Sequence, residues 1–361
     1  MTSTPIKVFL VEDSPVALTI LQRVLSSTPE IQVVGTAKNG LIALEEIPRS
    51  KPNIVCTDLL MGKMDGLELT KQLMAVYPVP ILVISQVVTD NDTKKIGQLL
   101  EAGVLDVFPK PKTGFIEDYE KQKEGLVQKI KLLSGVKVFS KSNKSVNVPK
   151  VEKVKPIKFE FNHKAASSIQ YKIVTIGVST GGPKALRTIF KTLPQNFPLP
   201  IVCIQHISEG FLTSLINWLN LDSLLKIKIA ENGELPLAGT VYFAPEKYHL
   251  ELDNQGRLIY SDAPPINNHR PAVTHTFNSI AQFYGQNTIG ILLTGMGRDG
   301  VVGMENLYHT GAMTIAQDEA TSIIFGMPQE AINLGVVKKV VPLHQITAAL
   351  MDLVTPKTSN I

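Results

Sequence analysis

The stretch Lys172–Leu186 reads KIVTIGVSTGGPKAL, and its pattern predicts a strand that turns sharply into a helix. The apolar run Ile173–Val178 stops at Ser179, and two glycines and a proline precede the helical pattern. Residues 177–181 fit the G-x-S-x-G pattern of a nucleophile elbow, which exposes a serine at the carboxyl end of a sheet. Backbone N–H groups at the helix start could stabilise an oxyanion there. A glycine-rich turn with an incidental serine, or a phosphate loop, fits the same pattern.

The length and composition of the chain favour two soluble domains. The 361 residues exceed one typical domain, and a hydrophobic content of 44% is enough for real cores. Neither a signal peptide nor an apolar run of roughly 18 residues is present, so we expect a soluble cytoplasmic protein without membrane insertion. Cys56 and Cys203 fall in expected strands and are interpreted as buried small hydrophobic residues.

Positive charge is concentrated in one segment. The net charge is +4, and eight lysines against two glutamates between residues 134 and 168 give that segment +6, which leaves the rest near −2 (4 − 6). We see no helix-turn-helix, zinc-finger or RNA-binding signature and expect no nucleic-acid partner. We expect a basic flexible linker at 135–168 between domains at 1–134 and 169–361, although Val151–Phe161 alternates enough to form an edge strand. A flexible chain of about 34 residues spans about 30 Å, so the domains could dock or separate.

The first part of the chain alternates strand and helix five times. Such alternation is typical of a parallel sheet covered by helices on both faces. The expected strands are Ile6–Val11, Ile31–Ala37, Asn53–Thr57, Pro80–Ile84 and Val104–Phe108. The expected helices are Ser14–Ser27, Leu41–Ile47, Leu67–Val76, Asp92–Ala102 and Phe115–Leu133. We predict a flavodoxin-like α/β domain with a five-stranded parallel sheet.

Polar side chains follow four of these strands at their carboxyl ends. Glu12 and Asp13 follow the first strand, Asp58 the third and Ser85 the fourth, and Lys110 comes just after the fifth. In a doubly wound sheet these ends meet at one crevice. Three carboxylates so close repel one another unless a cation joins them, and an all-oxygen set suits Mg²⁺. With Mg²⁺ bound, a carboxylate can accept a phosphoryl group. Each acid could instead be a helix N-cap, above all Asp13.

These residues make the first part of the chain resemble the receiver domain of two-component response regulators. The motifs are Val11-Glu12-Asp13-Ser14, Thr57-Asp58-Leu59-Leu60-Met61, Met64-Asp65-Gly66, Ile84-Ser85 and Pro109-Lys110-Pro111. The resemblance implies that Asp58 is phosphorylated and that Glu12, Asp13 and Asp58 bind Mg²⁺. It also implies that Ser85 and Lys110 are switch residues.

The alternation resumes in the second part of the chain, which predicts a second doubly wound α/β domain. The expected strands are Lys172–Val178, Pro200–Gln205, Lys226–Ala230, Thr240–Ala244, Thr288–Leu293, Ala312–Ala316 and Val336–Val340, with a hairpin at Tyr248–Leu252 and Arg257–Tyr260. The expected helices include Pro183–Leu193, Phe211–Leu219, Ala272–Phe283 and Val301–Tyr308.

A serine nucleophile needs a base, and the base needs a group that orients it. His206 directly follows an expected strand, and Asp299 lies in the loop TGMGRDG after another, so both would share one sheet edge with Ser179. A rival arrangement uses His344 as the base, in the Ser–Asp–His order of α/β-hydrolases, but the HGGG-type loop of that class is missing. A structural histidine and a helix-capping aspartate are the plainer alternatives. The remaining histidines are His163, His249, His269, His275 and His309.

This second part resembles the catalytic domain of the chemotaxis protein-glutamate methylesterases, the CheB family. The motifs are Ile176–Gly182, Gln205-His206, Ala244-Pro245, Leu293–Gly300, Ala316-Gln317-Asp318-Glu319 and Phe325–Pro328. The resemblance implies Ser179 as nucleophile, His206 as general base and acid, and Asp299 as the orienting group. A backbone N–H near Met296 is expected to support the oxyanion.

Four positions depart from the patterns of these families. Gly62 stands where receivers usually have proline, and Val107 stands where an aromatic switch residue is common. Glu246 replaces a common glycine, and Thr274 replaces an acid often found after His-Arg-Pro-x-Val. The first pair leaves the phosphorylation chemistry intact, and the second pair bears on receptor preference.

The combined resemblance implies a phosphorylation-regulated serine hydrolase. It would demethylate glutamate γ-methyl esters on methyl-accepting chemotaxis receptors, release methanol, and possess a glutamine deamidase activity that the sequence leaves open. A chemotaxis histidine kinase would be the phosphodonor, with Mg²⁺ in the receiver and no cofactor in the catalytic domain. We hypothesise that the unphosphorylated receiver covers the edge around Ser179. A receiver-gated hydrolase of another ester and a non-catalytic signalling adaptor are the alternatives.

Overall fold

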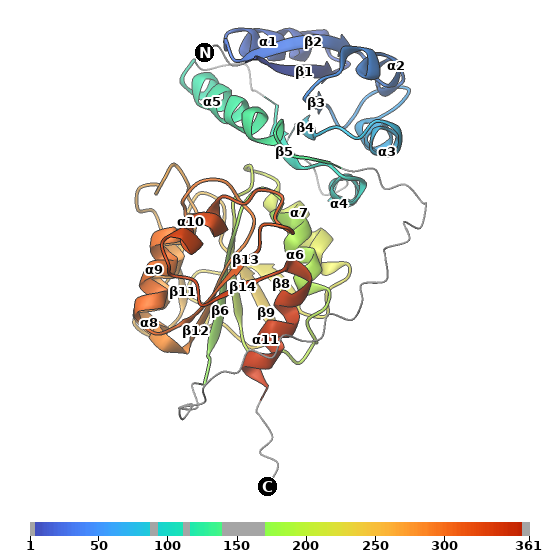
Figure 1. Ribbon diagram of the computed structural model, residues 1–361. Helices are drawn as coiled ribbons and strands as arrows, with labels where there is room; N and C mark the ends of the chain where they lie inside the picture. The colour runs from blue at the N-terminus through green and yellow to red at the C-terminus, as the bar shows by residue number, and fades with distance from the viewer. Residues whose placement is uncertain (1–3, 87–92, 111–115, 139–169, 356–361) are drawn as a thin grey trace.

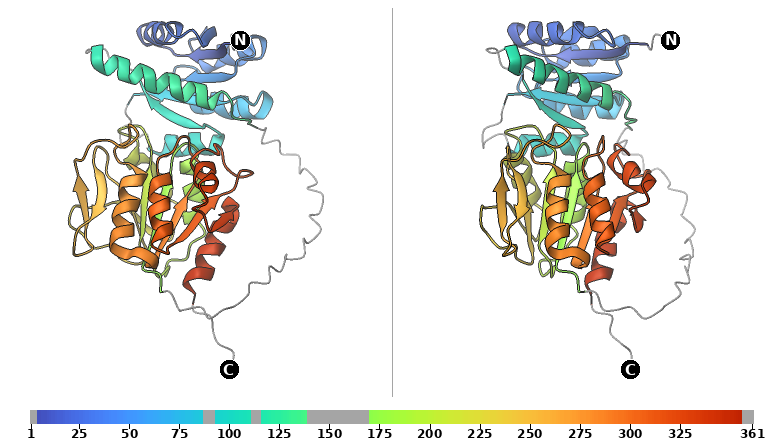
Figure 2. Two further views of the ribbon diagram at one scale, coloured as in Figure 1. Left: turned by 60° about the vertical axis from the view of Figure 1, so that its left-hand side comes forward. Right: turned by 90° about the vertical axis from the view of Figure 1, so that its left-hand side faces the viewer.

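The structure is a computed structural model that describes residues 4–86, 93–110, 116–138 and 170–355. It contains two α/β domains, one stacked on the other, as the views in Figures 1 and 2 agree. The N-terminal domain runs from β1 to α5 and the C-terminal domain from β6 to α11. Most of the expected linker, including Val151–Phe161, lies outside the described residues. Within the described ranges, no helix has the length and apolarity needed to cross a membrane.

The N-terminal domain contains the predicted five-stranded parallel sheet, in the order β2-β1-β3-β4-β5. Its strands are β1 (Ile6–Val11), β2 (Ile31–Ala37), β3 (Ile54–Thr57), β4 (Ile81–Ser85) and β5 (Asp106–Pro109). Its helices are α1 (Pro15–Ser26), α2 (Gly40–Ser50), α3 (Gly66–Val76), α4 (Thr93–Ala102) and α5 (Ile116–Leu133). Side chains of Ser14, Asn39 and Asp65 cap the first three helices. Asp13 therefore is not the cap of α1.

Alternate residues of β1 pack into different cores, as expected for a central strand covered on both faces. Val8 and Leu10 pack with the apolar faces of α1 and α5. Phe9 and Val11 pack with α2, α3 and α4. The second of these cores continues through α4 into the C-terminal domain, so the two domains share one apolar cluster.

The C-terminal domain contains a seven-stranded parallel sheet in the order β14-β13-β12-β6-β7-β9-β8, and a separate hairpin of β10 and β11. Its strands are β6 (Ile173–Val178), β7 (Ile201–Gln205), β8 (Lys226–Ile229), β9 (Thr240–Phe243), β10 (His249–Leu252), β11 (Leu258–Ser261), β12 (Thr288–Leu292), β13 (Met313–Gln317) and β14 (Lys339–Val341). Its helices are α6 (Gly182–Phe190), α7 (Leu212–Asn220), α8 (Val273–Tyr284), α9 (Val301–His309), α10 (Met327–Asn333) and α11 (Ile346–Val354). The predicted fold class is confirmed for both domains.

The expected strand at Val336–Val340 begins late. The amide of Val336 donates to the carbonyl of Ala331 (3.3 Å) and closes the turn after α10, so pairing with β13 starts only at Lys339. The short helix α10 was not predicted, because seven residues are too few to show a helical period.

The chain order reverses beside β6. From β6 the chain builds β7, β8 and β9 on one side, where they lie in the order β7-β9-β8, and later returns to build β12, β13 and β14 on the other. Loops that leave such a switch point in opposite directions open a crevice at the carboxyl ends of the strands, where ligands bind. The turn after β6 and the loop after β12 border this crevice, and they carry Ser179 and Asp299.

We predict that Gly66→Ala destabilises the N-terminal domain by about 1–3 kcal/mol, because a Cβ there would overlap the backbone carbonyl of Asp58, which cannot move aside cheaply. Gly62→Ala is the matched control in the same loop, since its Cβ would have no atom within 4 Å. Calorimetric unfolding of the full chain should show a lower transition temperature for the first variant alone. Equal transition temperatures for the two variants would contradict the close contact between Gly66 and the carbonyl of Asp58.

Candidate active site

Ser179 occupies the turn between β6 and α6. Its backbone N–H donates to the carbonyl of Thr294 (3.0 Å), so this turn is bonded to the loop that follows β12. Gly181, at the start of α6, has a φ of 82°, in the left-handed region that favours glycine. A Cβ on Gly295 would lie 2.7 Å from the Cβ of Ser179, so the close approach of these two loops requires a glycine there.

His206 leaves the sheet beside Ser179. Strands β6 and β7 are parallel with Val178 opposite Gln205, and the residue after each is the serine or the histidine. The amide of His206 donates to the carbonyl of Val178 (2.9 Å). The side-chain amide of Gln205 donates to the carbonyls of Ser179 and His206, both at 2.9 Å. These bonds hold the two strand ends in a fixed relation.

The imidazole of His206 is bonded to the carboxylate of Asp299. Nε2 lies 2.8 Å from Oδ2, and the two side chains are only 8% and 2% exposed. The same carboxylate accepts the backbone N–H groups of Val273 (2.7 Å) and Thr274 (2.9 Å), which begin α8. Asp299 is not the N-cap of the helix that follows it, α9, whose N-cap is Gly300; it bonds instead to the first amides of α8 and to the histidine.

This environment keeps Asp299 ionised. Burial alone would raise the pKa of Asp299, but the hydrogen bond and charge of His206, with hydrogen bonds from Thr274, lower that pKa to about 2. The carboxylate is therefore charged at neutral pH and accepts the proton on Nε2 of His206. An imidazole that donates from Nε2 carries its lone pair on Nδ1.

The lone-pair side of His206 is buried. Nδ1 forms no hydrogen bond with any atom of the described residues, so the hydroxyl of Ser179 does not occupy it here. The structure thus joins two of the three expected residues and places the third on the adjacent strand end.

Met296 lies on the loop between β12 and α9, with 53% of its surface exposed. The carbonyl of Gly295 accepts the amides of Gly326 (3.1 Å) and Met327 (2.8 Å), which fixes the peptide just before Met296. Among the described residues the amide of Met296 has no acceptor. This N–H is suited to stabilising negative charge on an oxygen beside Ser179.

A cavity of about 260 Å³ opens beside His206, lined by the loops after β7 and β9 and by the segment before α8. Glu246, one of the departures from the family pattern, lies in its wall. Its Oε1 accepts the amides of Gly210 (2.8 Å) and Leu212 (3.3 Å), so the loop after β9 is bonded to the start of α7. Glu246 therefore shapes the cavity indirectly, because it holds the backbone at the start of α7.

The rival base His344 lies elsewhere. It is exposed in the short turn Leu343–Gln345, next to β14, which is three strands away from β6 in the sheet. His249 is fully buried and accepts the amide of Ala272 (3.1 Å), while His309 is exposed on α9. His163 lies outside the described residues.

Sequence reasoning missed three polar residues that hold the loops of this site. Gln205 belongs to the motif Gln205-His206, but the sequence assigned no role to its side chain. The fully buried Gln317 accepts the amide of Thr294 (2.9 Å), and the hydroxyl of Thr294 donates to the carbonyl of Thr180 (2.9 Å). Their position at or just after the end of a buried strand was the only available signal, and it does not identify a partner.

The acidic residues of the N-terminal domain also gather as expected. Carboxylate oxygens of Glu12, Asp13 and Asp58 all lie within 4.8 Å of one another. The ammonium of Lys110 lies 2.6 Å from Asp58 Oδ2 and 2.9 Å from Glu12 Oε1. Ser85 is buried at the end of β4, and its carbonyl accepts the amide of Lys110 (2.8 Å).

The charges of this cluster fit a divalent cation. Burial raises the pKa of Glu12, although its contacts with Lys110 act in the opposite direction. An all-carboxylate set with one exposed member, Asp13, has the oxygen chemistry and the access to solvent that Mg²⁺ prefers.

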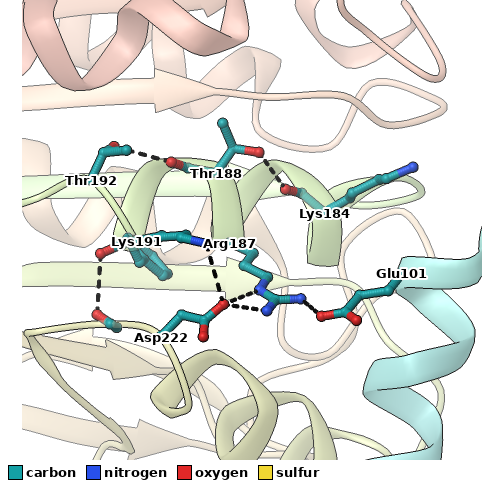
Figure 3. A network of polar contacts seen from close by, with 9 residues as sticks. Glu101, Lys184, Arg187, Thr188, Lys191, Thr192 and Asp222 are labelled. Atoms are coloured by element: carbon teal, nitrogen blue, oxygen red, sulfur yellow. Dashed lines mark hydrogen bonds and ion pairs between the residues drawn. The ribbon is translucent and has the colours of Figure 1, made fainter. Parts of the chain in front are cut away.

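The two domains contact each other through α4 on one side and α6 and α7 on the other (Figures 1 and 2). Gly97 of α4 lies against the indole of Trp218, and a Cβ at this position would overlap the ring. Arg187 lies over the same indole, 4.6 Å from its centroid. The guanidinium also bonds to Asp222 of its own domain and to Glu101 of α4, as Figure 3 shows.

A second group of contacts reaches the candidate active site. The hydroxyl of Thr180, the residue after the serine, donates to the carboxylate of Asp106 (3.4 Å). The hydroxyl of Ser208 donates to the carbonyl of Val107 (3.1 Å). Asp106 and Val107 belong to β5, so the strand that precedes Lys110 lies directly on the loops that carry Ser179 and His206.

Comparisons with known proteins bear on both domains. The family model "CheB methylesterase" matches residues 174–350, and the model "Response regulator receiver domain" matches residues 8–119. A protein-glutamate methylesterase/protein-glutamine glutaminase of Nitrosospira multiformis is 36% identical over 361 residues and 98% of each chain. One of Carboxydothermus hydrogenoformans is 41% identical over 94% of this chain and 96% of its own.

A solved structure resembles the C-terminal domain. The crystal structure of the Thermotoga maritima CheB methylesterase catalytic domain matches with a TM-score of 0.50 and 42% identity, over 51% of this chain and 100% of that one. The full-length relatives include both domains in the same order, since each covers nearly the whole chain. The chain therefore belongs to the CheB family, with a response-regulator receiver domain in front of a methylesterase domain, as its motifs predicted.

Proposed function

We propose that this chain is a receiver-regulated protein-glutamate methylesterase and protein-glutamine glutaminase. The observation that carries the proposal is the buried hydrogen bond between His206 and Asp299 beside the Ser179 turn, at the switch point of the sheet. The substrates would be methyl-ester and amide side chains of methyl-accepting chemotaxis receptors, in the cytoplasm. Full-length relatives named for these two activities support this assignment.

The ester reaction begins when Ser179 Oγ attacks the carbonyl carbon of the γ-methyl ester. Nδ1 of His206 takes the serine proton, while Asp299 holds the ring through Nε2. The amide of Met296 stabilises the oxyanion. The tetrahedral intermediate then expels methoxide, which leaves as methanol with the proton from Nδ1. A water molecule, deprotonated by the same nitrogen, cleaves the acyl-enzyme and releases the glutamate carboxylate.

The same residues serve a glutamine side chain. The serine oxygen again forms the acyl-enzyme, and the nitrogen leaves as ammonia after it receives the proton from His206. Both reactions end in glutamate. The amide is the slower substrate because its nitrogen must be protonated before it can leave.

In the receiver domain, Asp58 accepts the phosphoryl group from a chemotaxis histidine kinase. Glu12, Asp13 and Asp58 would hold Mg²⁺, which supplies charge neutralisation to the transferring group. Lys110 already contacts two of these carboxylates and would pair with the phosphate, and Ser85 lies at the adjoining strand end. A change at Asp58 thus reaches β5 through Lys110.

The receiver controls access to the catalytic domain. We take 1–134 as the receiver, 135–168 as the linker and 169–361 as the catalytic domain, a division that the family matches at 8–119 and 174–350 support. In the docked arrangement, β5 lies on the loops of Ser179 and His206. Phosphorylation would weaken this docking and open the site to a receptor helix.

We predict that Ser179→Ala and His206→Ala each lower methanol release by about 10³-fold or more, since each removes a member of the nucleophilic unit. Asp299→Asn should lower it on the order of 10³- to 10⁴-fold through loss of the correct tautomer. The measurement is labelled methanol from methylated receptor membranes, with His344→Ala as the control that keeps full activity.

The same variants separate the alternatives. An inactive His344→Ala beside an active His206→Ala would favour the other arrangement of a serine hydrolase. A wild-type chain whose Ser179 is not labelled by a fluorophosphonate would favour the non-catalytic adaptor.

We predict that a small phosphodonor with Mg²⁺ raises methanol release, and that EDTA or Asp58→Asn abolishes the increase, because the acceptor and its cation site are then lost. The expected increase is about fivefold or more, in the range of ordinary coupling free energies. Retention of the increase in Asp58→Asn would mean that another residue carries the phosphate.

We predict that Gly97→Leu raises methanol release without phosphorylation, by about fivefold or more, because the new side chain forces α4 away from Trp218. The emission of Trp218, the single tryptophan, should shift to longer wavelength as the indole becomes hydrated. Gly125→Ala on α5 is the control, since its Cβ would make an ordinary 3.6 Å contact with Phe108.

Removal of residues 1–140 should produce the same increase as Gly97→Leu. Unchanged or lower turnover in both proteins would show that the receiver does not cover the active site.

A further inference from the structure

His269 lies face to face with His206 in the wall of the cavity beside His206. The ring centroids are 3.8 Å apart and the ring planes differ by 5°. The ring of His206 thus has Asp299 at one edge and His269 across one face. Its Nδ1 edge, which must meet Ser179, has no partner among the described residues. The hydrogen bond at Nε2 leaves the ring some freedom to rotate about its Cβ–Cγ bond.

A tight turn presents His269 in this position. Ile266 and His269 exchange two backbone hydrogen bonds, of 3.1 and 2.9 Å. Between them, Asn267 and Asn268 have φ values of 51° and 64°, the left-handed pair typical of a two-residue type I′ turn. Asparagine tolerates this conformation better than most residues. His269 is therefore carried by a defined turn and not by an irregular loop.

The far end of the same segment is anchored as well. Shortly after His269 the chain enters α8, whose first two amides are bonded to Asp299. One carboxylate therefore fixes both the ring of His206 and the segment that carries the ring stacked on it.

The surrounding charges keep His269 neutral at physiological pH. Burial, and then the charge of His206, lower the pKa of His269 to about 4. Lys129 of α5 acts in the same direction, and Asp299 opposes both. A neutral ring can remain stacked when His206 takes the serine proton, whereas a second positive charge would oppose that transfer.

A second pair of stacked histidines has a purely structural role and can be compared with His206 and His269. His249 and His275 lie 4.2 Å apart with ring planes 16° from parallel. His249 accepts the amide of Ala272, and His275 bonds to Glu251. Both rings are therefore held by hydrogen bonds that build the fold. The ring of His269, in contrast, forms no hydrogen bond with another described residue, and its flat face is its contribution to the site.

We infer that His269 is a positioning residue for His206: its flat ring holds the imidazole so that Nδ1 meets Ser179 while Nε2 stays bonded to Asp299. The inference rests on the proposed roles of Ser179 and His206. A misplacement of about 1 Å at a reacting group can cost on the order of a hundredfold in rate. Loss of the stacked face should therefore appear in the chemical step more than in receptor binding.

The test uses the full chain, activated with a small phosphodonor and Mg²⁺, and a fluorophosphonate that labels Ser179. The second-order labelling rate reports the activation of the serine without any receptor. His269→Ala and His269→Leu both lack a flat ring, and each should slow labelling by about tenfold to a hundredfold. His269→Phe keeps the flat ring without nitrogen atoms and should keep most of the rate.

Methanol release from methylated receptor membranes supplies a second readout. In the Ala and Leu variants kcat should fall in parallel with the labelling rate, and KM should change much less. His275→Ala is the matched control, because it removes one ring from the other stacked pair and should leave both readouts unchanged. Thermal unfolding of each variant verifies that it is folded.

Equal labelling rates in His269→Ala and the wild type would overturn the inference. So would an inactive His269→Phe, because the ring nitrogens and not the flat face would then be required. A wild-type chain that labels normally but releases no methanol would refute the proposed substrate, while the comparison among the variants would still decide the role of His269. A wild-type chain that does not label overturns both.

Discussion

The hydrogen bond between His206 Nε2 and Asp299 Oδ2 joins segments that are far apart in the sequence, and the catalytic site depends on it. The carboxylate is held on its other side by the first amides of α8, so it cannot turn away from the imidazole without uncapping a helix. An uncapped helix loses about 1 kcal/mol, and a buried unpaired carboxylate costs more. Fold stability and the orientation of the base are thus enforced by the same atoms. This dual use explains why a loop residue between glycines is nearly inaccessible to solvent, at 2% exposure.

The receiver reaches the active site through a strand and not through a flexible segment. Asp106 at the start of β5 bonds to Lys129 of α5 (2.7 Å) and to the hydroxyl of Thr180, while the end of the strand leads to Lys110 in the acidic cluster. A displacement of β5 therefore changes the phosphoryl-accepting site and the serine turn together. The coupling is short because β5 is only four residues long.

Sequence patterns predicted both sheets, because parallel strands buried on both faces show as apolar runs that end in polar residues. The acids near Asp58, and the serine, histidine and aspartate of the second domain, followed from their places at strand ends. The contacts between domains could not be predicted in this way. Arg187 and Glu101 lie on exposed helix faces whose charges look like ordinary surface residues until the domains are docked. His269 was named among the histidines but given no role for a related reason, since a turn and not a periodic element presents it, and turn geometry sets where its ring points.

Arg187 retains partners on its own side of the boundary between the domains. Asp222 and the indole of Trp218 belong to the C-terminal domain, so the guanidinium remains neutralised when Glu101 departs. A partly exposed ion pair of this kind contributes only about 0–1 kcal/mol, and its loss strands no buried charge. Reversing a two-state population from 1:99 to 99:1 takes about 5.5 kcal/mol, and the ion pair of Arg187 and Glu101, which is only partly buried, adds little to that figure. In the proposed cycle, the same arrangement would let the domains reassociate after dephosphorylation with the guanidinium still paired to Asp222, so that the transition could be repeated over many signalling cycles.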